Sequence, residues 1–276
     1  VDRYFGDDKY GKDSSFKCDI SNVDLNSVIS EELTFDVLID LAAEIDFNVV
    51  DQRSLYINNT SCASSLLKFC IDRSIKKYIY TSSNSIYLGN SFGENSECDS
   101  PVPIDEYGRS KLDSENILSK NNSNIDVNII RCPNIIDAGR VGMLSILFEL
   151  LESGATLWVV GNGSVRHQCI YAQDLIVAIE KLLYIKGSNT FNIGSDNVPT
   201  FSEMYGQLIE YVGSNSAVRG LPEFLVVPLM KLLYKLGLSP MGPYQFRMLT
   251  NSFVFDPDLI KKTLNWAPTK TNVEML

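Results

Sequence analysis

A tyrosine and a lysine stand four residues apart in the stretch DEYGRSK, residues 105–111. On a helix, Tyr107 and Lys111 would share one face, one turn apart. A tyrosine with its ordinary pKa of about 10 is a poor base at neutral pH, and a neighbouring ammonium favours its phenolate form. Such a pair can take a proton from an alcohol or return one. Surface helices often carry the same spacing, so the chemistry depends on what else lies nearby.

The stretch YIYTSSNSIYLGN, residues 78–90, supplies hydroxyl groups at the end of a strand pattern. Ser82 and Ser83 would lie at the carboxyl end of that strand, where open α/β sheets bind ligands. Their alternative role is to cap a turn. Of the thirteen tyrosines only Tyr107 has a lysine four residues further on, and it follows this strand. The combination favours a proton-transfer site in which Ser83 holds the reacting oxygen.

The elements that must position these residues alternate between strand and helix in the first half of the chain. Apolar runs and helical spacing predict strands within 35–44, 76–83 and 127–132, and helices within 54–75 and 107–120. Such alternation is typical of a parallel sheet with right-handed crossovers. We therefore expect an α/β fold, a doubly wound parallel Rossmann-type sheet.

The second half reads as a smaller α+β domain. The pattern predicts a helix near 141–153, a short strand at 190–195, and a helix opened by Thr200 or Ser202 ahead of Glu203.

These elements place two domains along the chain. We expect a dinucleotide-binding domain at 1–135 with about 167–194, and a substrate-binding domain at 136–166 and 195–276.

The composition of the chain excludes several classes of binding partner and of chemistry. The net charge of −10 argues against nucleic acid and against an anionic membrane surface, and no signal peptide or transmembrane span is evident. Six cysteines without a C-x-x-C pair are typical of reduced thiols, which predicts a cytoplasmic protein. With His167 as the one histidine, neither a metal site nor Ser-His-Asp hydrolysis is expected.

A glycine pair after a strand resembles the start of a dinucleotide loop but lacks its third glycine. Gly161 and Gly163 begin a G-x-G-x-x-G pattern in which Arg166 takes the last place, and a strand-like run follows. We interpret both as turn glycines. If the chain is a dinucleotide enzyme, its first strand and glycine loop would precede Val1, and a chain extended by about 30 residues is expected to bind the dinucleotide more tightly.

Five stretches in order resemble the extended short-chain dehydrogenase/reductases of the nucleotide-sugar epimerase/dehydratase type. They are DLAAE with Asp40 in the usual histidine place, NNTSCA with Cys62 in place of glycine, IRCPNIIDAGR, GNGSVRHQCIYAQDL and FVFDPDLIKKTLNWAPT. The resemblance spans nearly the whole chain.

The resemblance implies a role for each matching position. Tyr107 is the expected catalytic base, with Lys111 and Ser83 as its catalytic partners. NAD is the expected cofactor, and Arg3 beside Asp2 also allows NADP. The implied cofactor-binding residues are Asp2, Asp19, Ile20, Leu41, Ala42, Ala43, Asn59, Ser82, Tyr107, Lys111 and Pro133; the implied substrate-binding residues are Ser83, Asn134 and Arg166.

Within this family, a carboxylate after the active-site hydroxyl serves elimination or decarboxylation, and here Asn84 and Ser85 stand there instead. That departure favours an epimerase of a nucleotide-diphosphate sugar. The alternatives are an NAD(P)-dependent dehydrogenase or reductase of a sugar, sterol or flavonoid-like alcohol, and a non-catalytic dinucleotide sensor. The helices at 54–75 and 107–120 resemble the family's dimer interface, so a homodimer is expected.

Overall fold

The computed structural model describes residues 18–45, 52–90, 93–121, 124–138, 144–238 and 243–276. Asp2, an expected cofactor-binding residue, and Arg3, which allows NADP, lie outside these residues. The chain divides into two compact units. The first comprises Val1–Gly89, Pro101–Arg131 and Ile179–Phe191, and the second Asn90–Ser100, Cys132–Ala178 and Asn192–Leu276.

A four-stranded sheet forms the centre of the first unit. Its order is β1-β2-β4-β8, with β1 at Val37–Asp40, β2 at Lys77–Ser83, β4 at Asp126–Cys132 and β8 at Asn189–Asn192. β1 runs parallel to β2, with Asp40 opposite Tyr80. The carboxyl ends of these two strands therefore lie side by side, as the Rossmann-type α/β prediction requires.

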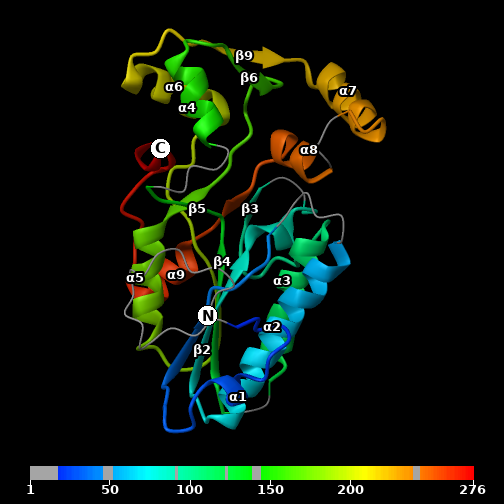
Figure 1. The fold of residues 1–276 in the computed structure, drawn as a ribbon. Coiled ribbons are helices and arrows are strands. Elements are labelled where there is room, and N and C mark those ends of the chain that lie inside the picture. The colour runs from blue at the N-terminus through cyan, green and yellow to red at the C-terminus, as the bar shows by residue number, and fades with distance from the viewer. Residues whose placement is uncertain (1–17, 46–51, 91–92, 122–123, 139–143, 239–242) are drawn as a thin grey trace. The chain divides into compact units, whose positions relative to one another are not determined.

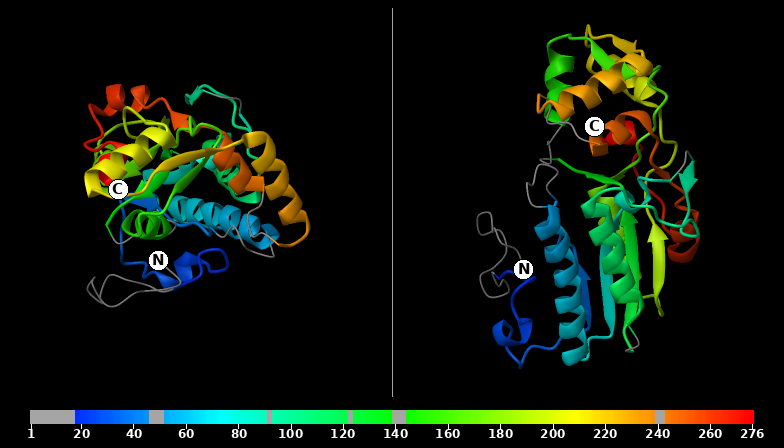
Figure 2. Two further views of the ribbon diagram at one scale, coloured as in Figure 1. Left: turned by 90° about the horizontal axis from the view of Figure 1, so that it is seen from above. Right: turned by 90° about the vertical axis from the view of Figure 1, so that its right-hand side faces the viewer.

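Helices α2 (Gln52–Asp72) and α3 (Glu106–Ser119) run side by side against one face of this sheet (Figure 1, Figure 2). The shorter α1 (Leu25–Val28) packs near them, and the 3-10 turn η2 (Asn84–Tyr87) follows β2 directly. Apolar side chains from these elements form one core. Its buried members are Ile20, Leu25, Ile29, Leu66, Phe69, Cys70, Ile75, Tyr78, Tyr80, Leu118, Ile125, Val127 and Ile129.

The second unit combines short parallel strand pairs with helices. β5 (Asn134–Ile136) pairs with β7 (Cys169–Tyr171), β6 (Leu157–Val160) with β9 (Val218–Leu221), and β10 (Val254–Phe255) with β3 (Glu94–Asn95). The helices are α4 (Leu144–Glu152), α6 (Phe201–Val212), α7 (Glu223–Lys235), α8 (Pro243–Thr250), α9 (Asp258–Leu264) and α10 (Asn272–Met275). α5 (Ala172–Leu182) contributes residues to both units.

Two local sequence signals are confirmed. Thr200 is the N-cap of α6 and forms a capping box with Glu203, which leaves Ser202 inside the helix. Gly161 and Gly163 have φ of 63° and 70° in a turn after β6, and a bridge at Arg166 rather than a helix follows. The interpretation of both residues as turn glycines is therefore right.

Candidate active site

The first turn of α3 places Tyr107 close to the end of β2. Asp105 caps the helix, because its Oδ1 accepts a hydrogen bond of 2.6 Å from the Gly108 amide. A Cβ atom on Gly108 would lie 2.6 Å from the carbonyl oxygen of Ser85. Only glycine therefore lets the turn that carries Tyr107 pack directly on the segment that follows Ser83.

Ser83 ends β2 and also caps η2. Its hydroxyl accepts from the Ser85 amide at 3.2 Å and donates to the Ser85 hydroxyl at 3.1 Å. The capping role considered from the sequence is thus present, and it fixes the orientation of the Ser83 side chain. Ser82 beside it is buried, and its hydroxyl has no hydrogen-bond partner among the residues placed in the structure.

Lys111 is almost completely buried, with 2 % of its surface exposed. Its ammonium donates a hydrogen bond of 2.8 Å to the carbonyl oxygen of Thr81 and lies 4.7 Å from the centre of the Tyr80 ring. Both partners belong to β2. The strand therefore holds this cation at its carboxyl end, one helical turn from the buried Tyr107.

Asn59 joins α2 to the first turn of α3. Its side-chain amide donates to the Ser110 hydroxyl at 3.0 Å, and Ser110 donates to the carbonyl oxygen of Tyr107 at 2.8 Å. Asn59 also binds the backbone of Glu44. Its Oδ1 accepts from the Glu44 amide at 2.8 Å, and its Nδ2 donates to the Glu44 carbonyl oxygen at 3.1 Å. This chain of hydrogen bonds ends at the Tyr107 backbone and so holds that residue in place. No pattern in the sequence indicates that Ser110 belongs to it.

Asp40 is a buried carboxyl group at the end of β1. It accepts hydrogen bonds from the Tyr78 hydroxyl at 2.7 Å and from the Ala42 amide at 3.0 Å. Burial raises the pKa of this carboxyl, while the charge of Lys111 and the Tyr78 donor oppose the rise. From the sequence Asp40 was only a departure from the family's histidine; the structure gives it an electrostatic link to Lys111.

A buried ion pair holds the far end of the same helix face. The Arg131 guanidinium donates from Nη2 to Glu115 at 2.7 Å and from Nε at 3.1 Å, and it also binds the Tyr87 hydroxyl. Tyr107, Lys111 and Glu115 follow one another at spacings of four, so all three lie on the face that meets the sheet. The pair thereby fixes the orientation of α3.

The remaining predicted cofactor-binding residues of the first unit precede α1 or follow β1. Asp19 accepts bonds from the Ser21 amide and hydroxyl, while the Ile20 side chain is part of the core. Leu41, Ala42 and Ala43 follow the end of β1.

Pro133, Asn134 and Arg166 belong to the second unit. Pro133 is buried, and Asn134 opens β5 with an exposed side chain. Arg166 is exposed. The hydrogen bonds of Glu203 with Thr200 lower the pKa of that carboxyl, and the charge of Arg166 lowers it further. The first unit thus brings Asn59, Ser82, Ser83, Tyr107 and Lys111 together around the ends of β2 and α3.

Comparison with known protein families gives one broad match. The model of the NAD dependent epimerase/dehydratase family matches residues 4–194. An uncharacterized protein, y4nG, of Sinorhizobium fredii is 31% identical over 204 residues, which cover 73% of this chain and 52% of that protein. The 3beta-hydroxysteroid-dehydrogenase/decarboxylase isoform 1 of Arabidopsis thaliana is 26% identical over 84% of this chain and 58% of its own length. The chain thus spans little more than half the length of these two relatives.

The same fold occurs in solved structures. The UDP-glucuronic acid 4-epimerase of Bacillus cereus, in complex with NAD, superimposes with a TM-score of 0.71 at 22% identity. The match covers 94% of this chain and 76% of that one.

Proposed function

Because the chain belongs to the NAD dependent epimerase/dehydratase family, we propose that it is an NAD-dependent epimerase of a nucleotide-diphosphate sugar. The observation that carries the proposal is the cluster of Ser83, Tyr107 and Lys111 around the ends of β2 and α3. The nucleotide-sugar substrate is supported by structural neighbours such as the Bacillus cereus epimerase.

Each residue of the cluster has a role in this reaction. Tyr107 takes the proton from a sugar hydroxyl and later returns it to the same oxygen, and inversion follows because the hydride adds to the opposite face of that ring carbon. Lys111 stabilises the phenolate through its buried positive charge, and Ser83 donates or accepts a hydrogen bond at the reacting oxygen. NAD, when bound, accepts the hydride and gives it back.

The first unit fits a dinucleotide. The buried Ser82 hydroxyl has no partner in the described part of the chain, and a buried hydroxyl is costly unless it finds one. It lies at the carboxyl end of β2, where a parallel sheet binds cofactors. We assign the cofactor to this unit, with Ser82, Asn59 and Lys111 among its contacts, and the sugar nucleotide to the second unit with Asn134 and Arg166.

The segment after Ser83 supports epimerisation over dehydration. Elimination needs a general acid or base there, whereas Asn84 carries an amide and Ser85 is bonded back to Ser83. In a site that lacks such a group, the oxidised sugar is not dehydrated, and it can turn over and accept its hydride on the other face.

A second candidate is a dehydrogenase that oxidises a sterol-like alcohol with net turnover of NAD. The match to the Arabidopsis steroid dehydrogenase over 84% of this chain supports it. The same three residues would perform the same proton transfer, so this candidate differs from the epimerase in its substrate and in keeping the hydride on the cofactor.

Substitution of Tyr107 by phenylalanine tests the proposal. The chain is incubated with NAD and with UDP-glucose or UDP-glucuronic acid, the sugar product is followed by NMR, and net reduction by absorbance. We expect epimerisation without net reduction, and a loss of kcat of about 10²–10⁴-fold in Tyr107→Phe. Tyr211→Phe, at an exposed tyrosine of α6, is the matched control. Unchanged turnover in Tyr107→Phe contradicts the proposed base. No conversion of either sugar, with steady reduction of NAD when a 3β-hydroxysteroid replaces them, favours the dehydrogenase.

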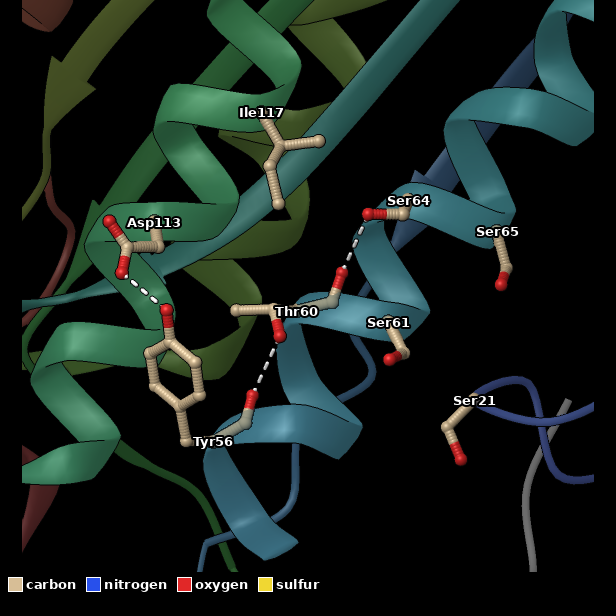
Figure 3. A pocket seen from close by; sticks show the side chains of 8 residues that line it. All are labelled: Ser21, Tyr56, Thr60, Ser61, Ser64, Ser65, Asp113 and Ile117. Carbon is tan, nitrogen blue, oxygen red and sulfur yellow. Dashed lines mark hydrogen bonds between the residues drawn. The ribbon is translucent and has the colours of Figure 1, made fainter. Parts of the chain in front are cut away.

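We further propose a cytoplasmic homodimer. The six cysteines all lie in the described part of the chain and none forms a disulfide, which suits a reducing compartment. Burial raises the pKa of Cys70 and of Cys169 to about 12, which keeps both thiols protonated. The outer face of α2 and α3 carries a hydroxyl-rich hollow of about 410 Å³ (Figure 3). Small polar side chains there permit close approach of a second helix pair; the lining residues are Ser21, Tyr56, Thr60, Ser61, Ser64, Ser65, Asp113 and Ile117.

A further inference from the structure

Helix α7 exposes a stripe of leucines at its surface. Leu225, Leu229, Leu232 and Leu236 recur at spacings of four, three and four, which places them on one side of the helix and its C-cap. Each is between 53 and 61% exposed, and none of the residues of α7 is buried. An apolar stripe of this length is unusual on a free surface and indicates a binding face.

The opposite side of α7 faces its own unit. Val226, Val227, Met230 and Leu233 are half-buried, and the Tyr234 ring meets Phe246 of α8 edge-on at 6.2 Å. Figure 1 shows α8 as the helical neighbour of α7. The leucine stripe is therefore not the face by which α7 packs on the protein.

Positive charge borders this stripe. Lys231 and Lys235 are exposed, and helical spacing puts them next to it together with Phe224, which is 75% exposed. Among the ion pairs of the described residues, neither lysine has a carboxylate partner. Residues 214–250 hold four basic side chains and a single acidic one, Glu223, in a chain of net charge −10.

An exposed aromatic and basic pair precedes the helix. Trp158 on β6 stands opposite Arg219 on β9, and both side chains are exposed. β9 leads into α7 through Pro222. Tryptophan is favoured at membrane–water interfaces, and arginine is attracted by anionic lipid headgroups.

We propose that α7 docks on an anionic lipid surface, with its leucine stripe among the acyl chains and Lys231 and Lys235 at the headgroup phosphates. Their aliphatic stems can lie along the apolar region while the ammonium groups stay in the polar layer. The proposal is independent of the chemistry assigned to Tyr107.

The length and the charges of α7 agree with this occupant. Thirteen residues make a helix of about 20 Å, too short for an apolar layer of about 30 Å, so the helix lies on the surface. No helix among the residues placed in the structure is long and apolar enough to cross a membrane. A second copy of α7 would supply one carboxylate, Glu223, against two lysines, so it offers less negative charge than an anionic surface does.

The expectation of no anionic membrane partner rested on the charge of the whole chain. At physiological salt, charges more than about 8 Å away are largely screened, so the local charge of α7 governs its contact with a surface.

Vesicle co-sedimentation of the full chain tests the proposal. We expect binding to phosphatidylcholine vesicles that contain phosphatidylglycerol and little binding to phosphatidylcholine alone. Lys231→Gln with Lys235→Gln should weaken binding by about 30-fold, and added salt should weaken the original chain further. Leu229→Ser with Leu232→Ser should abolish binding, with circular dichroism unchanged because both side chains are exposed.

Matched controls are Leu259→Ser, an exposed leucine of α9, and Lys186→Gln, an exposed lysine of the first unit; both should bind like the original chain. Equal binding to both lipids, no binding to either, or full binding by the leucine variant overturns the proposal. Light scattering that shows a dimer dissolved by the leucine variant assigns the stripe to a second copy and also overturns it.

Discussion

Asp40 links stability to pH because it titrates inside the protein. Burial raises its pKa, so the folded state holds this proton more tightly than the unfolded state does. The contribution to stability is fully present below the ordinary pKa of about 4 and is lost as pH rises through the raised value. Asp40→Asn keeps an acceptor for the Ala42 amide and removes the charge, so the variant should gain stability relative to the original chain as pH rises from about 4.

Urea denaturation at a series of pH values measures this difference. Tyr78→Phe is the informative partner, since it removes a donor that lowers the pKa of Asp40 and should extend the pH-dependent range upward. Parallel stability curves for Asp40→Asn and the original chain would show that Asp40 does not titrate in this range.

The role of a residue could be predicted from the sequence where it belongs to a motif, and could not where the role depends on a contact with a distant residue. The spacing of Tyr107 and Lys111 is enough to predict their role. The contacts of Lys111 with the Thr81 carbonyl and the Tyr80 ring depend on how α3 packs on β2. The same holds for Ser110, whose contact with Asn59 requires α2 and α3 to lie side by side.

At the scale of elements, the approach of α3 to η2 depends on Gly108. Alanine there must displace the Ser85 backbone or the helix, because its Cβ would lie 2.6 Å from a carbonyl oxygen. We expect Gly108→Ala to lower the unfolding free energy by about 1–3 kcal/mol, despite the better helix propensity of alanine, and to reduce kcat. Gly206→Ala in α6 is the control, since its Cβ would meet open space; it should stabilise by about 0.5–1 kcal/mol.

The Glu115–Arg131 pair holds α3 against β4 and can be tested by single and double replacement. Glu115→Gln leaves a buried guanidinium without its counter-ion and should cost about 3–5 kcal/mol of unfolding free energy. Glu115→Met with Arg131→Met removes both charges and should recover most of that loss. Denaturation in urea measures both variants, and a double variant no more stable than the single one would show that the pair itself supplies the stability.

Element positions follow well from local signals. The expected helix at 107–120 is α3 at Glu106–Ser119, and the expected strand at 76–83 is β2 at Lys77–Ser83. Capping by Asp105 and the apolar run of β2 are encoded within a few residues. By contrast, the parallel pairing of β6 with β9 joins residues about sixty apart, and no local pattern specifies it.

At the scale of the whole molecule, the α/β class was predictable because strand and helix patterns alternate along the chain, which requires a parallel sheet. The distribution of exposed apolar surface was not. The sequence FLVVPLMKLLYKLGL shows hydrophobicity, but only the folded chain, in which Val226, Met230 and Leu233 are half-buried, reveals which side of α7 is outward.

The proposed homodimer is tested on the hydroxyl-rich face of α2 and α3 (Figure 3). Ser64 is exposed there, and its hydroxyl donates to the carbonyl oxygen of Thr60 within the same helix. A larger side chain at this position would therefore point into solvent and break no hydrogen bond between elements. We expect light scattering to give twice the mass of one chain, and Ser64→Arg to give the mass of one, because a long cation would block the approach of a second helix pair. Ser164→Arg, at an exposed serine of the second unit, should leave the dimer intact. If the unsubstituted chain has a single-chain mass, this face has no partner of its own kind; if Ser64→Arg remains dimeric, the contact between subunits lies elsewhere.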